Sequence, residues 1–269
     1  SSFIGGGLCN QVTGLNSTVV GGALNTASVA YSFIGGGFCN NAAGVGCNVV
    51  VGGCRNDIQA CNSFIGGGTT NTINISGLGG YGIIVGGSGN CIDGSSKSYN
   101  FIGNGTSNCI DLNVEHSVIG SGASNKITKG SCSAIITGFN NCVETPAGSG
   151  CSVILAGRAN IVTTAYSVIG SGCNNIITGS GNHNFIGTGC RNTILAGRGN
   201  KVTTGYSMIG SGCNNIITGS SQCYNFIGTG CKNTISGSNF TSIVGGFSNT
   251  ASADFTFIGG GKCNLVSDN

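Results

Sequence analysis

Charged residues, proline and tryptophan are scarce in this chain of 269 residues. Charged side chains make up 6% of it, proline occurs once and tryptophan does not occur. Disordered segments are rich in charge and poor in β-branched residues, whereas this chain shows the reverse. Collagen needs glycine at every third residue together with abundant proline, so the 53 glycines have another cause. The composition therefore argues against disorder, collagen and an ordinary globular domain.

Signals for several partners are also missing. The ten Lys and Arg residues are scattered, which argues against nucleic acid as a partner. No apolar run approaches the ~20 residues that span a bilayer, so we expect no membrane insertion. No Cys-x-x-Cys occurs and the only histidines are His116 and His183, so we expect no metal site and no cofactor. Because the chain begins Ser1-Ser2-Phe3, without Met or a signal-like segment, we expect it to be a piece of a longer protein.

A short repeat runs through the whole chain. A regular series of seventeen Gly-x-x-Asn segments follows at spacings of 15 to 19 residues, with one spacing of 8. When positions are numbered from the asparagine as zero, position −6 is always Ile or Val, and position +2 is always Val, Ile or Ala. Such residues favour strands, whereas Gly and Asn supply the positive φ angles of corners. Each repeat therefore predicts two short strands joined by a corner.

The repeat predicts an all-β fold, a parallel β-solenoid of about 16 to 17 short coils, since so short a unit cannot bury its apolar residues alone. Residues 1–269 would form one such solenoid, with coils stacked at ~4.8 Å around a thin continuous interior. The predicted core ladder at −6 contains Ile4, Val19, Ile34, Val50, Ile65, Ile102, Ile119, Ile169, Ile186, Ile209, Ile227 and Ile258. The asparagines would form one hydrogen-bonded corner column, containing Asn10, Asn25, Asn40, Asn56, Asn71, Asn90, Asn108, Asn125, Asn175, Asn215, Asn233 and Asn264.

Positions −7 and −5 share the face opposite to −6. Where −5 is Gly, −7 is Phe, Val or Met, and where −5 is aliphatic, −7 is never Phe or Met. Each coil thus places an apolar side chain on a second face, which in a two-stranded coil needs a cover. We expect a homo-oligomer, most simply a parallel homotrimer; a wider three-sided monomer is the alternative. The predicted oligomer face contains Phe3, Val20, Phe33, Val51, Phe64, Val85, Phe101, Phe185, Met208, Phe226 and Phe257.

The spacing of 8 residues lies inside a tandem duplication, 152–191 and 192–231. The segment Ile154-Leu155-Ala156-Gly157-Arg158 recurs forty residues later as Ile194-Leu195-Ala196-Gly197-Arg198. At the start of the second copy, Ile194 is at +2 from Asn192 and also at −6 from Asn200. The turn that separates these two positions in other repeats is missing. We therefore expect an irregular coil near residues 192–197.

The unit Ser-x-Ile-Gly-x-Gly-x-x-Asn-x-Ile, as in 167–177, resembles the Gly/Asn-rich repeats of phage and large-virus tail-fibre proteins. It is also similar to the Ser-Val-x-Ile-Gly head repeats of YadA-type trimeric autotransporter adhesins. That resemblance implies a trimer of parallel β-rolls with about one repeat per coil. The corner asparagine and the many cysteines depart from the adhesin pattern and favour the viral fibre.

Cysteines fall into the same columns as the repeat. Cys91 and Cys109 occupy +1 of successive coils, and Cys132 and Cys151 occupy −9. Position −2 is shared by two further candidate pairs, Cys173 with Cys190 and Cys213 with Cys231. Stacked columns place Cα atoms within disulfide range, so coil-to-coil disulfides are one interpretation. Small apolar filler is the other, since parallel neighbours point the same way, and both stay open.

We expect a structural protein and no catalytic residue. The chain would be the shaft or receptor-binding segment of an extracellular or virion-surface trimeric fibre, with a host glycan or receptor as a further partner. A bacterial cell-surface adhesin is the alternative within this class. A glycan-cleaving tailspike is the alternative from another class, because Asp93 and Asp111 occupy +3 of successive coils and a close carboxylate pair can hydrolyse glycosides.

Overall fold

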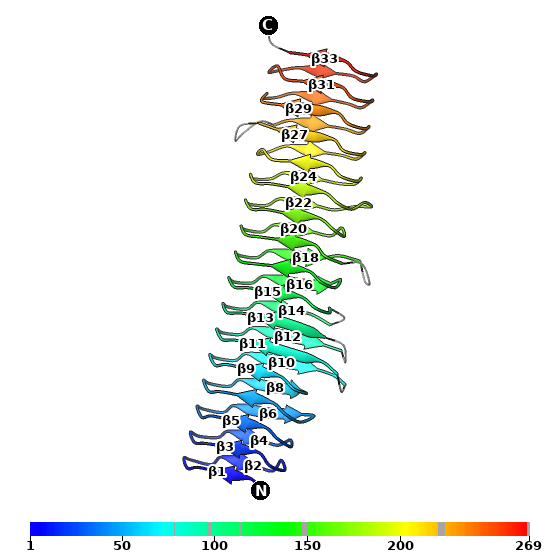
Figure 1. The fold of residues 1–269 in the computed structure, drawn as a ribbon. Coiled ribbons are helices and arrows are strands. Elements are labelled where there is room, and N and C mark those ends of the chain that lie inside the picture. The colour runs from blue at the N-terminus through cyan, green and yellow to red at the C-terminus, as the bar shows by residue number, and fades with distance from the viewer. Residues whose placement is uncertain (78, 96–97, 113, 147–149, 220–223, 268–269) are drawn as a thin grey trace. The chain divides into compact units, whose positions relative to one another are not determined.

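A computed structural model describes residues 1–77, 79–95, 98–112, 114–146, 150–219 and 224–267 (Figure 1). The predicted fold class is confirmed: the chain is an all-β parallel β-solenoid of about 16 turns, and the described ranges contain no helix. It divides into two compact units, Ser1–Thr137 (unit 1) and Gly138–Asn269 (unit 2). In each unit the odd-numbered strands pair in one parallel sheet, the odd sheet, and the even-numbered strands in another, the even sheet.

Unit 1 stacks its coils in chain order, with every strand beside its equivalent in the next coil (Figure 1). Its odd sheet contains β1 (Phe3–Ile4), β3 (Thr18–Val19), β5 (Phe33–Ile34), β7 (Val49–Val50), β9 (Phe64–Ile65), β11 (Tyr81–Ile84), β13 (Tyr99–Ile102), β15 (Val118–Ile119) and β17 (Ala134–Ile135). Its even sheet contains β2 (Gln11–Val12), β4 (Thr26–Ala27), β6 (Asn41–Gly44), β8 (Asp57–Ala60), β10 (Thr72–Ile75), β12 (Cys91–Gly94), β14 (Cys109–Ile110) and β16 (Lys126–Lys129).

Unit 2 is built in the same way. Its even sheet contains β18 (Cys142–Glu144), β20 (Ile161–Val162), β22 (Ile176–Ile177), β24 (Thr193–Ile194), β26 (Met208–Ile209), β28 (Phe226–Ile227), β30 (Ser242–Ile243) and β32 (Phe257–Ile258). Its odd sheet contains β19 (Val153–Ile154), β21 (Val168–Ile169), β23 (Phe185–Ile186), β25 (Lys201–Val202), β27 (Ile216–Thr218), β29 (Thr234–Ser236), β31 (Thr250–Ala251) and β33 (Leu265–Val266). The described strands thus form two sheets per coil and not the three sides of the wider alternative.

The interior is a single layer of aliphatic side chains between the two sheets. Residues at −6 and +2 between the end coils are inaccessible to solvent, as Ile65 and Ile73 illustrate. In the first coil Ile4 is 46% exposed, and Ile258 near the other end of the sequence is 6% exposed. Parallel register stacks each aliphatic residue on its equivalent in the next coil, such as Ile73 on Ile92. Short strands therefore bury apolar area that one repeat could not bury alone.

Each coil turns at two corners, and both use left-handed backbone. At the Gly-x-x-Asn corner, Gly68 has a φ of 90° and Thr70 a φ of 53°. A Cβ at Gly68 would collide with the carbonyl oxygen of Gly87 in the next coil. At the other corner Tyr31, with a φ of 60°, precedes the buried Ser32. A left-handed residue followed by a buried polar residue is thus common to both corners.

The buried asparagine of each Gly-x-x-Asn corner joins three coils. Nδ2 of Asn71 donates to the carbonyl oxygens of Gly67 and Gly87, at 2.9 and 3.0 Å. Oδ1 of Asn71 accepts the backbone N–H of Asn90 at 3.0 Å, and the backbone N–H of Asn71 is bound in turn by Oδ1 of Asn56. Every polar atom of the side chain is therefore satisfied without water.

The 8-residue spacing removes half a coil from unit 2. After Asn192 the chain forms β24 in the even sheet and enters the next Gly-x-x-Asn corner directly, so that β25 lies in the odd sheet. β24 still pairs in parallel with β22 and β26, and the stack is unbroken. The −6 strands consequently lie in the odd sheet up to Ile186 and in the even sheet from Ile194 onward. Equivalent residues of the two duplicated segments, such as Ile169 and Ile209, lie in opposite sheets.

This half-coil step divides the asparagines that the sequence placed in one column. Asn200 donates its backbone N–H to Oδ1 of Asn184, at the opposite corner from Asn192. The column of Asn192 continues through Ser207, whose N–H lies 3.0 Å from Oδ1 of Asn192. Asn215, Asn233 and Asn264 therefore belong to a different column from Asn175. Likewise Ile209, Ile227 and Ile258 line the interior from the even sheet, whereas the preceding members of the core ladder line it from the odd sheet.

Replacing one corner asparagine should weaken the stack. Asn71→Ala leaves the buried N–H of Asn90 without its acceptor, and we expect the free energy of unfolding to fall by about 2–3 kcal/mol. Asn74→Ala, at an exposed position in the same coil, is the matched control and should change it by less than about 0.5 kcal/mol. Guanidinium denaturation followed by far-UV circular dichroism measures both. Equal losses in the two variants would contradict the assigned role of the corner.

Candidate interaction face

An apolar outer face covers the odd sheet of unit 1. We call the outward residues at −7 and −5 of its nine strands the odd face of unit 1. None is charged, and Thr18 is the only one with a polar side chain. Phe3 is 57% exposed, Val20 47%, Val51 49% and Val85 49%. The face contains Phe3, Gly5, Thr18, Val20, Phe33, Gly35, Val49, Val51, Phe64, Gly66, Ile83, Val85, Phe101, Gly103, Val118, Gly120, Ala134 and Ile136.

Backbone packing explains why glycine at −5 accompanies phenylalanine at −7. A Cβ built on Gly66 would collide with the carbonyl oxygen of Val85 in the next coil. The same Cβ would lie 3.3 Å from Cε1 of Phe64, so the ring lies over its own glycine. Gly35 and Phe33 repeat the arrangement at 3.4 Å. The rings are therefore held against the sheet as a flat, rigid surface.

The opposite outer face of unit 1 is polar. Its outward positions at +1 and +3 on the even sheet include Thr26, Asn41, Asp57, Gln59 and Asn74. Some of these side chains bond to one another, since Nδ2 of Asn41 donates to Oδ1 of Asp57 at 2.8 Å. The outer surface of the odd sheet is thus apolar and that of the even sheet is polar. Both sheets nevertheless present aliphatic side chains to the interior.

The half-coil step moves the apolar face of unit 2 from one sheet to the other. Leu155 and Phe185 lie outward on the odd sheet, whereas Met208, Phe226 and Phe257 lie outward on the even sheet. The predicted oligomer face contains Phe185, Met208, Phe226 and Phe257 together with the residues of unit 1. The prediction of a single face is wrong. It was based on the alternation at positions −7 and −5, and the strands that carry these positions move from the odd sheet to the even sheet at residue 194.

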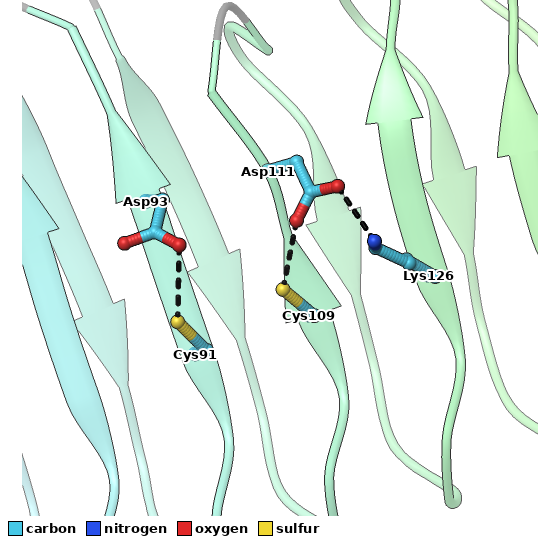
Figure 2. A network of polar contacts seen from close by, with 5 residues as sticks. All are labelled: Cys91, Asp93, Cys109, Asp111 and Lys126. Atoms are coloured by element: carbon cyan, nitrogen blue, oxygen red, sulfur yellow. Dashed lines mark hydrogen bonds and ion pairs between the residues drawn. The ribbon is translucent and has the colours of Figure 1, made fainter.

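Cysteine and aspartate side chains meet on the polar face of unit 1, on neighbouring strands (Figure 2). The thiol of Cys91 lies 3.5 Å from Oδ2 of Asp93, and that of Cys109 lies 3.1 Å from Oδ1 of Asp111. Oδ2 of Asp111 forms an ion pair with Nζ of Lys126 at 2.8 Å. The hydrogen bond with the Cys91 thiol, burial and the hydrogen bond with Asp111 together raise the pKa of Cys109. A protonated thiol is a poor nucleophile, and Asp111 already has a cationic partner in Lys126, so the cluster contributes side-chain hydrogen bonds and an ion pair between β14 and β16.

The other predicted cysteine pairs differ in their placement. Cys173 with Cys190, and Cys213 with Cys231, are partners in single parallel bridges at the corners. The members of these two pairs, like Cys91 and Cys109, are thiols in the structure. Cys132 belongs to unit 1 and Cys151 to unit 2.

Columns of stacked aromatic rings lie at the second corner of the repeat, the one that does not contain Gly-x-x-Asn. The sequence did not lead us to predict them. Tyr206, Tyr224, Phe240 and Phe255 stack with ring centroids 4.9 to 5.3 Å apart. All four have positive φ; three of them stand directly before a buried Ser, Asn or Thr, and Phe255 stands before the half-buried Thr256. That adjacency to the polar corner residue is the signal that could have located them. Because the ring faces cover one another, the column leaves mainly ring edges to solvent.

The residues that the structure describes hold no group of three or more His, Cys, Asp or Glu side chains placed to bind a metal ion. In the same residues, no helix has the length and apolar character needed to cross a membrane. Comparison with models of known protein families and with curated protein sequences finds no match to this chain.

The raised pKa of Cys109 has a kinetic consequence. Alkylation requires the thiolate, so iodoacetamide at pH 8 should label Cys109 at least about tenfold more slowly in the folded chain than in urea. The exposed Cys263 in the same molecule serves as the reference for reagent activity. Time-resolved peptide mapping gives both rates. Equal labelling of Cys109 in the folded and unfolded chain would contradict the hydrogen-bonded thiol.

Proposed function

We propose that the chain is a structural segment of an extracellular fibre, most simply a viral one, whose copies assemble side by side as a parallel homotrimer. The observation that carries this proposal is the odd face of unit 1, an uncharged surface nine strands long. Monomeric soluble proteins rarely expose so continuous an apolar surface.

The dimensions of this face support a copy of the same chain as its cover. Nine strands at ~4.8 Å, with outward side chains spanning about 15 Å across, give roughly 600 Å² per copy from unit 1 alone. In a trimer each copy shares this surface between two neighbours, so three such surfaces bury about 1,800 Å² in total, or about 600 Å² at each of the three contacts from unit 1 alone. A parallel copy has the same coil spacing, so the contact repeats at every coil.

The solenoid itself suits a mechanical role. Each corner asparagine satisfies its polar atoms through neighbouring coils, and the strands leave few backbone amides unpaired. A stack of this kind holds its length without a large core. Such a segment would serve as a protease-resistant spacer that keeps a host-contacting part of the fibre, directed at a glycan or receptor, away from the particle surface.

A charge on the odd face should disrupt assembly. We expect the unaltered chain to have three times its monomer mass by light scattering, and Phe33→Lys to weaken association at least about tenfold, because the ammonium group would be buried without a partner. Asn74→Lys, on the polar face of the same unit, is the control and should leave the mass unchanged. A stable monomer at micromolar concentration, or equal behaviour of both variants, would overturn the proposed assembly.

A further inference from the structure

Two pairs of cysteines stand one above the other at the corners of unit 2. The backbone of Cys173 pairs with that of Cys190 in a parallel β-bridge between successive coils. Cys213 and Cys231 form a second β-bridge of the same kind. Bridge partners in a parallel ladder have Cα atoms about 4.8 Å apart, inside the range of 4.4 to 6.8 Å that disulfides accept. The thiols of the first pair are close enough to share a hydrogen bond, which is the main cause of the raised pKa of Cys173.

Their surroundings differ from those of the third stacked pair. Arg158 is the bridge partner of Cys173 on its other side, and Arg198 holds the same place beside Cys213. Arg158 and Arg191 oppose the effect of Cys190 on the pKa of Cys173. Cationic neighbours favour the thiolate, which is the form that attacks a disulfide, and at Cys173 they offset part of the rise in pKa that the hydrogen bond with Cys190 and burial cause.

Cys91 and Cys109 have the opposite environment. Each thiol faces a carboxylate, Asp93 at 3.5 Å and Asp111 at 3.1 Å, in the cluster of Figure 2. A thiolate there would meet negative charge and lose its hydrogen bond to the carboxylate. The chain therefore contains stacked cysteines of both kinds, which provides an internal control.

We propose that Cys173–Cys190 and Cys213–Cys231 are disulfide-forming sites that link successive coils of unit 2, whereas Cys91 and Cys109 remain thiols. A small-molecule disulfide such as oxidised glutathione is the oxidant. One thiolate of a pair attacks it, forming a mixed disulfide and releasing one reduced thiol. The second thiolate of the pair then attacks the protein-bound sulfur, so that the coil-to-coil bond forms and a second reduced thiol leaves. The two protons of the pair end on the two released thiols, and one disulfide is reduced for each one formed.

The two bonds lie on either side of the half-coil step. Each would close a loop of about 17 or 18 residues and so limit the separation of neighbouring coils. Neither bond requires the proposed trimer, because both cysteines of a pair belong to one chain.

Mapping of unreduced peptides tests the proposal. The full-length chain in a Cys223→Ser background is incubated with oxidised glutathione at pH 8, quenched with acid and digested with trypsin. Residues 159–191 then hold Cys173 and Cys190 as their only cysteines, and 202–232 hold only Cys213 and Cys231. We expect each peptide to lose two hydrogen atoms, with fragmentation placing the link between the named residues. The peptides of Cys91 and Cys109 should stay separate and be at least about tenfold slower to oxidise.

A second variant keeps the result interpretable. Cys190→Ser should trap Cys173 as a mixed disulfide with glutathione and leave the Cys213–Cys231 link intact. Corner cysteines that remain thiols or form only intermolecular links would overturn the proposal, as would oxidation of Cys91 and Cys109 at the same rate as the corner pairs. Light scattering of the Phe33→Lys chain is independent of these outcomes, so failure of the disulfides and failure of the fibre assembly are distinguishable.

Discussion

Exact register between coils is the constraint on which the structure depends, and the corner asparagine enforces it. Its amide has partners in its own coil and in both neighbours, as Asn71 shows with Asn56, Gly67 and Gly87. A shift of one residue would leave a buried carbonyl and a buried N–H unpaired at every corner. The glycine at −3 allows this close approach, because any side chain there would meet the backbone of the next coil. With register fixed in this way, aliphatic residues stack on aliphatic residues and a thin layer of Ile and Val is a sufficient core.

The second corner solves the same problem with less specific chemistry. Ser17 supplies its hydroxyl as the acceptor for the N–H of Ser32, and Asn48 and Asn100 supply amide oxygens at equivalent places. In most coils both corners therefore have a left-handed residue followed by a small polar residue that accepts from the next coil, although Asn100 follows Tyr99 of β13 instead. This equivalence explains why unit 2 tolerates the loss of half a coil: when Asn200 arrives at the second corner, it finds Asn184 in the coil before it and forms the bond that a serine would form.

Periodicity was sufficient to predict the parallel solenoid, because −6 and +2 are aliphatic in every repeat and a repeat of about 15 residues buries both by stacking on its neighbours. It was not sufficient to place each repeat in space. The sequence marks one corner strongly and the other weakly, so numbering from Gly-x-x-Asn gives the same position to residues that lie at different corners. Asn184, which ends a further Gly-x-x-Asn beginning at Gly181, lies in the other column and, together with the 8-residue spacing, could have revealed the exchange. The aromatic stacks were missed for the same reason, since they belong to the weakly marked corner.

The half-coil step also limits how a flat partner can follow unit 2. Before the step, Leu155 and Phe185 are exposed on the odd sheet, and after it Leu195 and Phe257 are exposed on the even sheet. On the odd sheet after the step, the outward column at +3 is instead Thr203, Thr218, Ser236, Ser252 and Ser267. A copy packed along the odd sheet would thus meet apolar side chains up to β23 and, beyond it, the hydroxyl groups of the +3 column beside a mixed +1 column that contains Lys201 and Ile216. Burying a hydroxyl without a partner costs free energy, whereas burying Phe or Leu gains it. Close apolar packing on that side should therefore stop near residue 190, even though the backbone ladder that carries it continues without interruption.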